Sequence, residues 1–449
     1  MGTILGTIVA FVIVFGVLVF VHEFGHFFMA KLVKIRVEVF SWGYGKRLIG
    51  IKKGDTDYRI SILPLGGFVK FTGEDVFEKK EDLPPYDLRA KRRWERFLVM
   101  VMGSVMNILL AVVLVVIISM LGVTAPEYVE KKPVIGWIEA DSPAERANLL
   151  AGDEILKIND KKTRTWREVE LAVGTKPDRL ITLEVKRGDE ILTKELVTGS
   201  KKSLDFEIGY AGFSPNALTQ IVEVTPDAPA EKAGMKAGDV ILASSEETIY
   251  YHQFVDIIEK NPGEKLEFLI EREGEQLTLD VTPRLEEAVG KIGVSISAWI
   301  QFKTKKYSFF PAIGRSIKEN TRLAFTLFHY LKELIAGEAS AKQVGGPIMI
   351  AKYSYTFFRA GFVSMLGFMA FVSLQLGIIN LFPVPVFDGG QILVLGLEGL
   401  FRKDFSPKVK QIAMMVGFAI FVFLIGFLIL NDVARTLPKG WESYLFWKK

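Results

Sequence analysis

Two histidines and a glutamate near the N-terminus have the types and the spacing that zinc-dependent hydrolysis requires. His22 and His26 lie four positions apart in the stretch VHEFGH, and Glu23 directly follows the first of them. On a helix, residues i and i+4 lie on one face, so both imidazoles can bind the same Zn²⁺ ion. Glu23 then lies close enough to act as a general base on a water molecule. The motif therefore predicts a hydrolytic zinc site.

This motif lies inside an apolar segment, where ionisable groups are expensive. A bound dication is the compensation that we expect for them, and an incidental motif in a core helix is the alternative. The segment, residues 4–30, is one of four runs that reach membrane length, which is about 20 residues. The other three runs are residues 97–123, 361–382 and 412–430. The sequence thus predicts four spans, with the motif inside the first.

The composition fits apolar spans that alternate with soluble domains. Of the 449 residues, 49% are hydrophobic, yet 24% are charged, which is high for a bundle of membrane helices alone. The net charge is only +4, and the basic residues are not gathered into a groove-like block with interleaved aromatic residues. Nucleic-acid binding is therefore not expected. The chain has no cysteine, which excludes disulfides, thiol nucleophiles and cysteine-bound metals.

Lysine and arginine near the ends of the spans predict the orientation in the membrane. The N-terminal MGT has no basic side chain, whereas Lys31, Lys34 and Arg36 follow the first span and RAKRRWER precedes the second. We therefore expect the loop between these spans in the cytoplasm, and residues 124–360 and both termini outside. His22 would lie about 27 Å along the first span, so the metal should lie near the cytoplasmic face.

A hydrolytic zinc site has three protein ligands and an open fourth position. The remaining histidines, His252 and His329, are expected on the outer side, so the third ligand should be a carboxylate. Asp388 is the sole acid in NLFPVPVFDGG (residues 380–390), at the inner end of the third span. Pro383 and Pro385 break the helix there, which lets the chain turn back toward the metal. A proline-rich turn with a surface aspartate is the alternative.

The region between the second and third spans contains an internal repeat. DSPAERANLLAGDEIL (141–156) aligns without gaps with DAPAEKAGMKAGDVIL (227–242), and the same offset brings LEVKRGDE (183–190) onto LIEREGEQ (269–276). A repeat of about 85 residues suits two copies of a small domain. Each copy resembles a circularly permuted PDZ domain, which accepts a peptide as an added strand. Two rigid spacers without a ligand are the alternative. Asn148 stands where the second copy has Gly234, so the first copy departs from the usual turn.

HEFGH in the first span, N-x-x-P-x-P-x-x-D-G in the third, and tandem PDZ repeats between the second and third resemble the site-2 protease family of intramembrane zinc metalloproteases. The resemblance covers nearly the whole chain, although Phe387 stands where the family commonly has leucine. It implies a protein of the bacterial inner (cytoplasmic) membrane, with the PDZ domains and both termini in the periplasm. It also implies single-span membrane proteins in the lipid bilayer as substrates, such as an anti-sigma factor already trimmed by another protease, or remnant signal peptides.

The resemblance further implies positions that bind the substrate. Gly43 and Gly45 resemble the family's G-x-G turn, where missing side chains let a substrate backbone approach. Asn380, followed by Pro383 and Pro385, is a candidate for holding the substrate or a developing oxyanion, and a helix cap is its alternative role. Three short β-type segments, 35–41, 57–64 and 66–71, resemble the family's membrane-associated β-element, whose edge can pair with an unwound substrate. A plain cytoplasmic hairpin is the alternative.

We therefore expect a polytopic α-helical membrane protein with four transmembrane helices and a membrane-associated β-element, plus two exterior α+β PDZ domains. The expected divisions are the first span (1–31), the β-containing loop (32–96), the second span (97–123), PDZ domains at 124–205 and 206–285, an amphipathic helical linker (286–356), the third span (357–390), and the fourth span with a tail (391–449).

The expected activity is that of a zinc endopeptidase that cleaves single-span proteins in the membrane, with the PDZ pair as a size filter. Peptide ligands of the PDZ domains are a further expected class of partner. One rival is a non-catalytic PDZ scaffold in which the histidine motif is incidental. Another is a metal transporter with the same ligands. Three ligands beside a glutamate favour a hydrolase over a transporter, because a transporter would need acidic or histidine sites along several spans.

Overall fold

The computed structural model describes residues 2–73, 83–203, 206–286, 288–337 and 344–436, and the chain divides into two compact units. One unit combines residues 1–123 with residues 305–449, and the other comprises residues 124–304. The first unit contains the predicted spans, and the second contains the predicted repeats.

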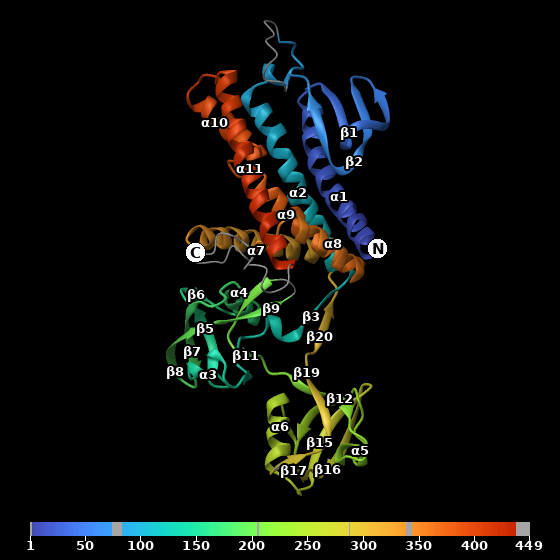
Figure 1. The fold of residues 1–449 in the computed structure, drawn as a ribbon, viewed down its shortest axis with the longest axis vertical. Coiled ribbons are helices and arrows are strands. Elements are labelled where there is room, and N and C mark those ends of the chain that lie inside the picture. The colour runs from blue at the N-terminus through green and yellow to red at the C-terminus, as the bar shows by residue number, and fades with distance from the viewer. Residues whose placement is uncertain (1, 74–82, 204–205, 287, 338–343, 437–449) are drawn as a thin grey trace. The chain divides into compact units, whose positions relative to one another are not determined.

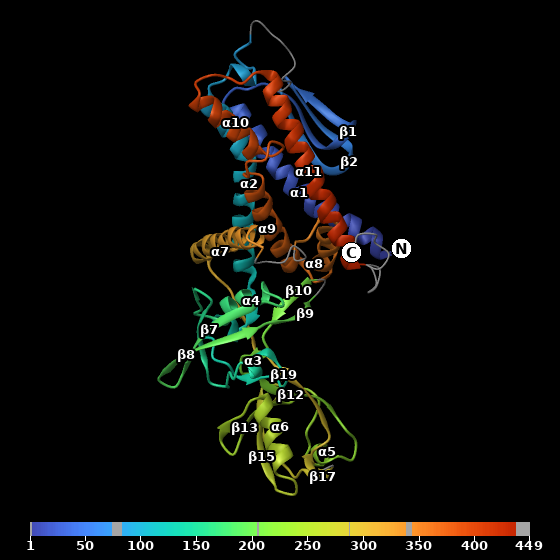
Figure 2. The ribbon, with the colours of Figure 1, turned by 60° about the vertical axis from the view of Figure 1, so that its left-hand side comes forward.

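Four helices in the described part of the chain are long and apolar enough to cross a membrane, and they coincide with the four predicted runs. They are α1 (Gly2–Leu32), α2 (Arg93–Leu121), α9 (Phe362–Ile379) and α11 (Pro407–Thr436). The predicted end of the second span at residue 123 is wrong, because α2 ends at Leu121 and Gly122 leaves the helix with φ +123°. The chain continues as strand β3 (Val123–Pro126). Figures 1 and 2 show α1, α2 and α11 lying lengthwise alongside one another.

Helix α2 packs closely against both neighbours that carry predicted site residues. A Cβ added at Gly25 of α1 would lie 2.4 Å from the carbonyl oxygen of Met102 in α2, so the two backbones touch there. On the other side, Ser373 of α9 donates a hydrogen bond to the Asn107 carbonyl oxygen at 2.8 Å. Small residues at such crossings let membrane helices approach closely. Helix α2 is therefore the common support of α1 and α9.

The loop after α1 forms a β-element from β1 (Val37–Lys53) and β2 (Thr56–Phe71), and then the short helix η1 (Leu88–Ala90). Residues 39–42 of β1 pair on both sides, with residues 57–60 and with residues 67–70 of β2. The segment 47–53 pairs with 56–61, so the structure has one more β-segment than the three predicted. The segment 67–71 lies at an edge of this sheet. Its Val69 and Phe71 pack with Ala30 of α1 and Val99 of α2, which holds the edge against these two helices.

The link between the repeats and α9 is not the single amphipathic helix that the sequence predicts. The structure has α7 (Phe309–Ile335), which lies across α2 (Figure 2), and α8 (Pro347–Arg359). Pro347 starts a new helix because it cannot donate a backbone hydrogen bond within a continuing one. A further helix, α10 (Asp388–Leu400), separates α9 from α11 and crosses the predicted boundary between residues 390 and 391.

Helix α8 is tied to the far end of the chain. The buried Asp432 of α11 accepts hydrogen bonds from the backbone N–H groups of Gly346 and Met349, at 2.8 and 3.1 Å. These groups belong to the first turn of α8, whose unpaired N–H groups favour a carboxylate. The last span therefore caps α8.

The second unit contains two copies of one fold. The first copy has a sheet ordered β6-β5-β7-β8, and the second has a sheet ordered β16-β15-β13-β12-β19. The elements of the first copy are η2 (Glu127–Glu130), β4 (Trp137–Ile138), α3 (Pro143–Arg146), β5 (Glu154–Ile158), β6 (Lys161–Lys162), α4 (Trp166–Gly174), β7 (Leu180–Arg187), β8 (Glu190–Val197), β9 (Gly199–Ser203), β10 (Phe206–Tyr210) and β11 (Phe213–Ser214). The elements of the second copy are β12 (Leu218–Val224), α5 (Pro229–Lys232), β13 (Val240–Ser244), β14 (Glu247–Thr248), α6 (Tyr251–Lys260), β15 (Leu266–Arg272), β16 (Glu275–Val281), β17 (Arg284–Glu286), β18 (Val289–Lys291) and β19 (Val294–Trp299).

The boundaries of both copies differ from the predicted ones. Strand β11 pairs with β4, so the first copy extends past residue 205. Strand β19 pairs with β12, so the second copy extends past residue 285 into the predicted linker. In each copy the closing strand pairs with the opening one, and such long-range pairing is not visible in the local sequence pattern. Strand β20 (Phe302–Lys305) then pairs with β3, which joins the two ends of the unit.

An arginine–aspartate ion pair is present at the equivalent position of each copy. Arg187 donates to both carboxylate oxygens of the buried Asp153, at 2.7 and 2.8 Å, and Arg272 does the same to Asp239. Burial acts to raise the pKa of Asp153, but the hydrogen bonds from Arg187 outweigh it and lower that pKa. Because Arg187 and Arg272 make equivalent contacts, they should be aligned with each other. The ungapped alignment, which pairs Lys186 with Arg272, is therefore one residue out of step here. The second copy is one residue shorter before this strand.

The turn at which the first copy has Asn148 and the second has Gly234 adopts the same backbone conformation in both copies. Asn148 has φ +53° and Gly234 has φ +83°, so both residues lie in the left-handed region. Asparagine is among the few residues besides glycine that adopt this conformation at a helix end. The carbonyl oxygens of both residues accept hydrogen bonds from the respective arginines. At this turn the first copy therefore differs from the second in residue type but not in backbone conformation.

Candidate metal centre and catalytic cavity

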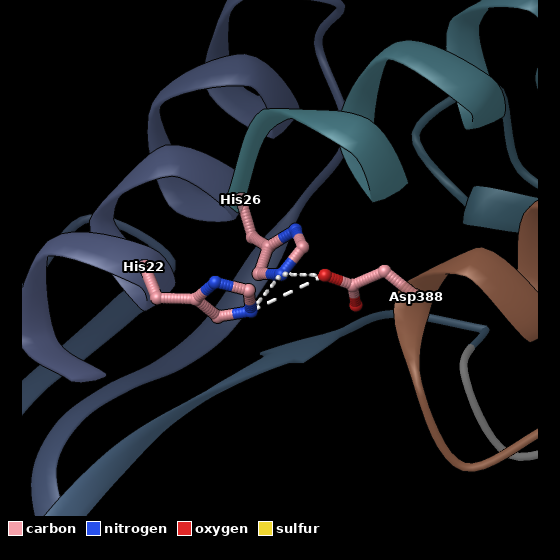
Figure 3. A group of neighbouring side chains, drawn as sticks. All are labelled: His22, His26 and Asp388. Carbon is pink, nitrogen blue, oxygen red and sulfur yellow. Dashed lines mark hydrogen bonds and ion pairs between the residues drawn. The ribbon is translucent and has the colours of Figure 1, made fainter. Parts of the chain in front are cut away.

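Three of the predicted site residues converge at one point (Figure 3). His22 and His26 lie one turn apart on α1, and their Nε2 atoms are 3.1 Å apart. Asp388, at the start of α10, places Oδ2 3.2 Å from Nε2 of His22 and 3.5 Å from Nε2 of His26. Both histidines are buried. Residues 362 positions apart in the sequence thus present three donor atoms to one small volume.

The orientation of His26 leaves its Nε2 free to bind a metal. Its Nδ1 lies 2.7 Å from the carbonyl oxygen of Val99 in α2, which can only accept a hydrogen bond. Nδ1 therefore carries the hydrogen, and the lone pair of the neutral imidazole is on Nε2. Metal-binding histidines commonly have their second nitrogen fixed in this way. Helix α2 thus selects the tautomer of a histidine on α1.

The spacing of the donor atoms fits a tetrahedral zinc ion. Two ligands at about 2.0–2.1 Å from a tetrahedral centre lie about 3.3–3.4 Å from each other. The three separations here are 3.1, 3.2 and 3.5 Å. Oδ2 of Asp388 is buried and receives no hydrogen bond of acceptable geometry, although both imidazoles lie within ion-pair distance. A buried carboxylate oxygen without a donor calls for a cation. The donor set and its geometry therefore fit zinc.

A tight turn places Asp388 at this point. The chain leaves α9 at Asn380, and the Gly389 N–H returns to donate to the Asn380 carbonyl oxygen at 2.8 Å. A Cβ at Gly389 would lie 2.2 Å from the Leu381 carbonyl oxygen, and one at Gly390 would lie 2.2 Å from that of Val384. Only glycine fits such contacts. The two glycines after Asp388 are therefore required for the turn that delivers its carboxylate.

The three residues open onto a cavity of about 1200 Å³. Glu23, the predicted base, also lines it, together with Asn380 and Pro385, two of the predicted substrate-binding positions. Gly43, Gly45 and Pro383 do not belong to the cavity wall among the described residues. Gly43 instead packs against the β-element itself, where a Cβ would lie 2.6 Å from the Leu63 carbonyl oxygen.

The edge segment 67–71 of the β-element forms one wall of the cavity. Phe68, Val69 and Phe71 line it, and the backbone of Val69 hydrogen-bonds with the Glu23 carboxyl group. A Cβ at Gly67 would lie 3.6 Å from Cγ of Glu23. An open sheet edge therefore lies directly beside the predicted base.

Sequence reasoning missed Gly103 of α2, which lies against both histidines. A Cβ at this position would lie 2.3 Å from Nε2 of His26 and 2.8 Å from Cε1 of His22. Nothing in the apolar run LVMVMGSVMN distinguishes this glycine. The signal would have required knowledge of which face of α2 meets α1.

Buried histidines and an aspartate with tetrahedral spacing, a glutamate beside them and helices of membrane length define a membrane-embedded metalloprotease. The chain belongs to peptidase family M50, whose family model matches residues 10–424. It is a zinc metalloprotease, which confirms the family predicted from the motifs. The sequence is 30% identical to "Putative zinc metalloprotease" of Vibrio cholerae, over 97% of this chain and 100% of that protein. It is 32% identical to "Protease RseP" of Yersinia pestis and 30% identical to "Regulator of sigma-E protease RseP" of Escherichia coli K12, with the same coverage.

One solved structure matches a short part of the chain. A PDZ domain of the SdrC-like protein of Listeria monocytogenes is 18% identical, over 18% of this chain and 90% of that chain, with a TM-score of 0.17. A score of this size does not establish a shared fold.

Proposed function

We propose that this zinc metalloprotease cleaves single-span membrane proteins within or near their membrane segment. His22, His26 and Asp388 would be the zinc ligands, and Glu23 would be the general base. The observation that carries the proposal is the convergence of the three donor atoms at tetrahedral spacing inside helices of membrane length. When bound, zinc supplies Lewis-acid chemistry that activates water and polarises the scissile carbonyl.

Glu23 takes a proton from the attacking water on its carboxylate and later returns it to the leaving amine. The backbone of Val69 holds this carboxylate in place from the edge of the β-element. A substrate helix hides its amides in internal hydrogen bonds, so it must unwind before cleavage. The edge segment 67–71 offers its backbone groups to the extended form, as in other cases of strand addition. Asn380, on the same cavity wall, would hold the substrate backbone or the developing oxyanion.

The catalytic proposal is tested by Glu23→Gln, which keeps the shape of the side chain but cannot take a proton. We expect purified protein with normal zinc content and no cleavage of a model single-span substrate. Glu95→Gln is a matched control, because glutamine can replace glutamate in the capping interaction that Glu95 makes with the Arg92 N–H. Near wild-type cleavage by the Glu23 variant would refute the assigned role.

The substrates that we propose are anti-sigma factors already trimmed outside the membrane, and remnant signal peptides. The name of the relative in Escherichia coli, which refers to regulation of sigma E, supports the anti-sigma part of this class. We further propose that the protein lies in a bacterial inner membrane, with both termini and the repeats in the periplasm and the metal near the cytoplasmic face. The distribution of lysine and arginine supports this orientation. Single cysteines in this cysteine-free chain should be labelled from outside at Asp160 or Gly274 and only after permeabilisation at Lys403.

We also propose that the two repeats are PDZ domains that act as a size filter. They would exclude proteins with bulky exterior domains, which gives selectivity without tight binding. Deleting residues 134–283 should then permit cleavage of a span that still carries a folded exterior domain. If the repeats are docking sites for peptides instead, the deletion should slow cleavage of short substrates. Equal rates for short and bulky substrates, with and without the repeats, would leave the repeats as spacers.

A further inference from the structure

Charged side chains other than the proposed metal ligands and base also line the catalytic cavity. Beyond the proposed ligands and base, its wall includes Arg89, Arg96, Lys410 and Glu398. Arg89 donates to both carboxylate oxygens of the buried Asp87, at 3.1 and 2.9 Å. Lys410 lies 2.6 Å from Oε1 of Glu398, which is also buried. Two of the three cations are therefore neutralised by carboxylates of the protein itself.

Arg96 is the cation that has no such partner. Among the described residues, no carboxylate lies within ion-pair distance of its guanidinium, and its Nε is buried without a hydrogen bond. Its charge acts on Asp404, but that carboxylate is hydrogen-bonded by Arg93 at 2.8 Å. A desolvated guanidinium nitrogen without an acceptor is costly. Within the part of the chain that the structure describes, Arg96 is thus the one cation of the cavity wall without a carboxylate partner.

The position of Arg96 along α2 sets how far its backbone lies from the residues beside the metal centre. Gly103 of the same helix lies against His26, and the Val99 carbonyl oxygen accepts from the same imidazole. Arg96 lies seven residues before Gly103, so these two positions are about 10 Å apart along one face of the helix. An extended peptide rises about 3.3 Å per residue. About three residues of an extended substrate cover that distance.

We propose that Arg96 determines specificity by pairing with a carboxylate side chain of the substrate about three residues from the scissile bond. This inference rests on the proposed function. Guanidinium binds carboxylate through two parallel hydrogen bonds, which fix position as well as charge. A lysine at the same substrate position is repelled, which adds discrimination against wrong partners. Because aspartate is rare within apolar spans, a carboxylate near the cleavage point marks the end of a membrane segment.

A substrate carboxylate is favoured over the phosphate of an anionic lipid by the location of the arginine. Arg96 lines the same cavity as Glu23, Asp388 and Asn380, where the cleaved peptide must lie. Its Nε is buried, whereas Lys403 and Arg402 are exposed cations nearby in the basic loop before α11. A lipid headgroup would more readily meet the exposed pair. The experiment below distinguishes a lipid phosphate from a substrate carboxylate as the partner of Arg96.

The test uses full-length zinc-loaded protein in vesicles of zwitterionic phosphatidylcholine. A single-span substrate carries Asp, Asn or Lys at one position, moved from two to five residues on either side of the cleaved bond. For the wild type, we expect one position at which Asp raises kcat/KM about tenfold over Asn, which corresponds to about 1.4 kcal/mol. The ratio should fall to about one in Arg96→Gln and should favour Lys in Arg96→Glu. Lys403→Gln is the matched control and should keep the tenfold ratio.

Each other result overturns the inference. If the wild type cleaves all substrates with no preference for Asp at any position, Arg96 does not read substrate charge, although the proposed function stands. If a preference appears but persists in Arg96→Gln, another group provides it. If Arg96→Gln changes cleavage only when phosphatidylglycerol is added, its partner is the lipid. A wild type that holds zinc but cleaves none of the substrates refutes the proposed function itself. Zinc content and thermal unfolding of each variant, together with Arg96→Lys, exclude loss of folding as the cause.

Discussion

Replacing Gly103 with alanine should remove zinc from the proposed site while the protein stays folded. The added Cβ would lie 2.3 Å from Nε2 and 2.7 Å from Cε1 of His26. Carbon and nitrogen atoms in contact lie about 3.5–4.0 Å apart, so the overlap exceeds 1 Å. Moving helix α2 away from α1 would open their close contact at Gly25, where a Cβ would lie 2.4 Å from the Met102 carbonyl oxygen, and would lose the packing there. The imidazole of His26 is therefore the group that must turn.

A turned imidazole loses its place in the donor set. Metal–ligand distances tolerate only about 0.2 Å, and loss of a supporting contact alone lowers zinc affinity about 10–100-fold. The turn also breaks the hydrogen bond from Nδ1 to the Val99 carbonyl oxygen. We therefore expect affinity to fall at least about 100-fold, or about 2.7 kcal/mol. The cost to folding should be that of ordinary overpacking, about 1–3 kcal/mol.

Elemental analysis of the purified variant measures the zinc, and cleavage and thermal unfolding are followed in parallel. Gly396→Ala is the matched control, because a Cβ at that position of α10 would meet nothing within 4 Å. The control should retain zinc and activity and should be equally stable or more stable by up to about 1 kcal/mol, since alanine favours helix over glycine. Full zinc occupancy and wild-type cleavage in Gly103→Ala would refute the assignment of this point as the metal site.

Three further predictions concern Asp388, Asp153 and Asp432. Asp388→Ala should lower zinc content in elemental analysis, and full occupancy would point to a third ligand elsewhere. The lowered pKa of Asp153 stabilises the fold above its unfolded value of about 3.9, and this stabilisation is lost as pH falls through the lower folded value. The urea midpoint of the repeat unit, followed by tryptophan fluorescence, should thus fall below about pH 4, and less steeply in Asp153→Asn; an equal fall in both would contradict this. Asp432→Ala should speed amide exchange at Gly346 and Met349 about fivefold, for a lost cap of about 1 kcal/mol, and unchanged exchange would show that the cap is not needed.

The residues that converge at the site could be predicted because their signals are local. The spacing of His22 and His26 defines one helix face, and Asp388 follows two prolines that force a turn. The doubled sequence likewise predicts two copies of one domain. Each of these inferences needs only the period of a helix, the chemistry of proline or self-similarity, so no knowledge of tertiary packing is required.

The rest depends on packing that the sequence does not encode locally. An apolar helix such as α2 does not reveal which face meets which neighbour, so the roles of Gly103 and Arg96 were invisible. The ends of the repeats depend on β11 and β19 pairing with strands far back in the chain. The extra β-segment at residues 47–53 similarly arises because β1 folds so that both of its halves pair with β2.

Helix α2 carries no proposed metal ligand or catalytic acid, yet it controls the site. Its Val99 carbonyl oxygen fixes the tautomer of His26, and its missing side chain at Gly103 leaves room for both imidazoles. It also supports α9, the helix whose end leads to Asp388, through the contact between Ser373 and Asn107. Substitutions on this face of α2 should therefore reduce zinc content and cleavage before they reduce stability. Helix α2, whose sequence is that of an ordinary membrane-spanning helix, thus positions α1 and the Asp388 turn relative to each other.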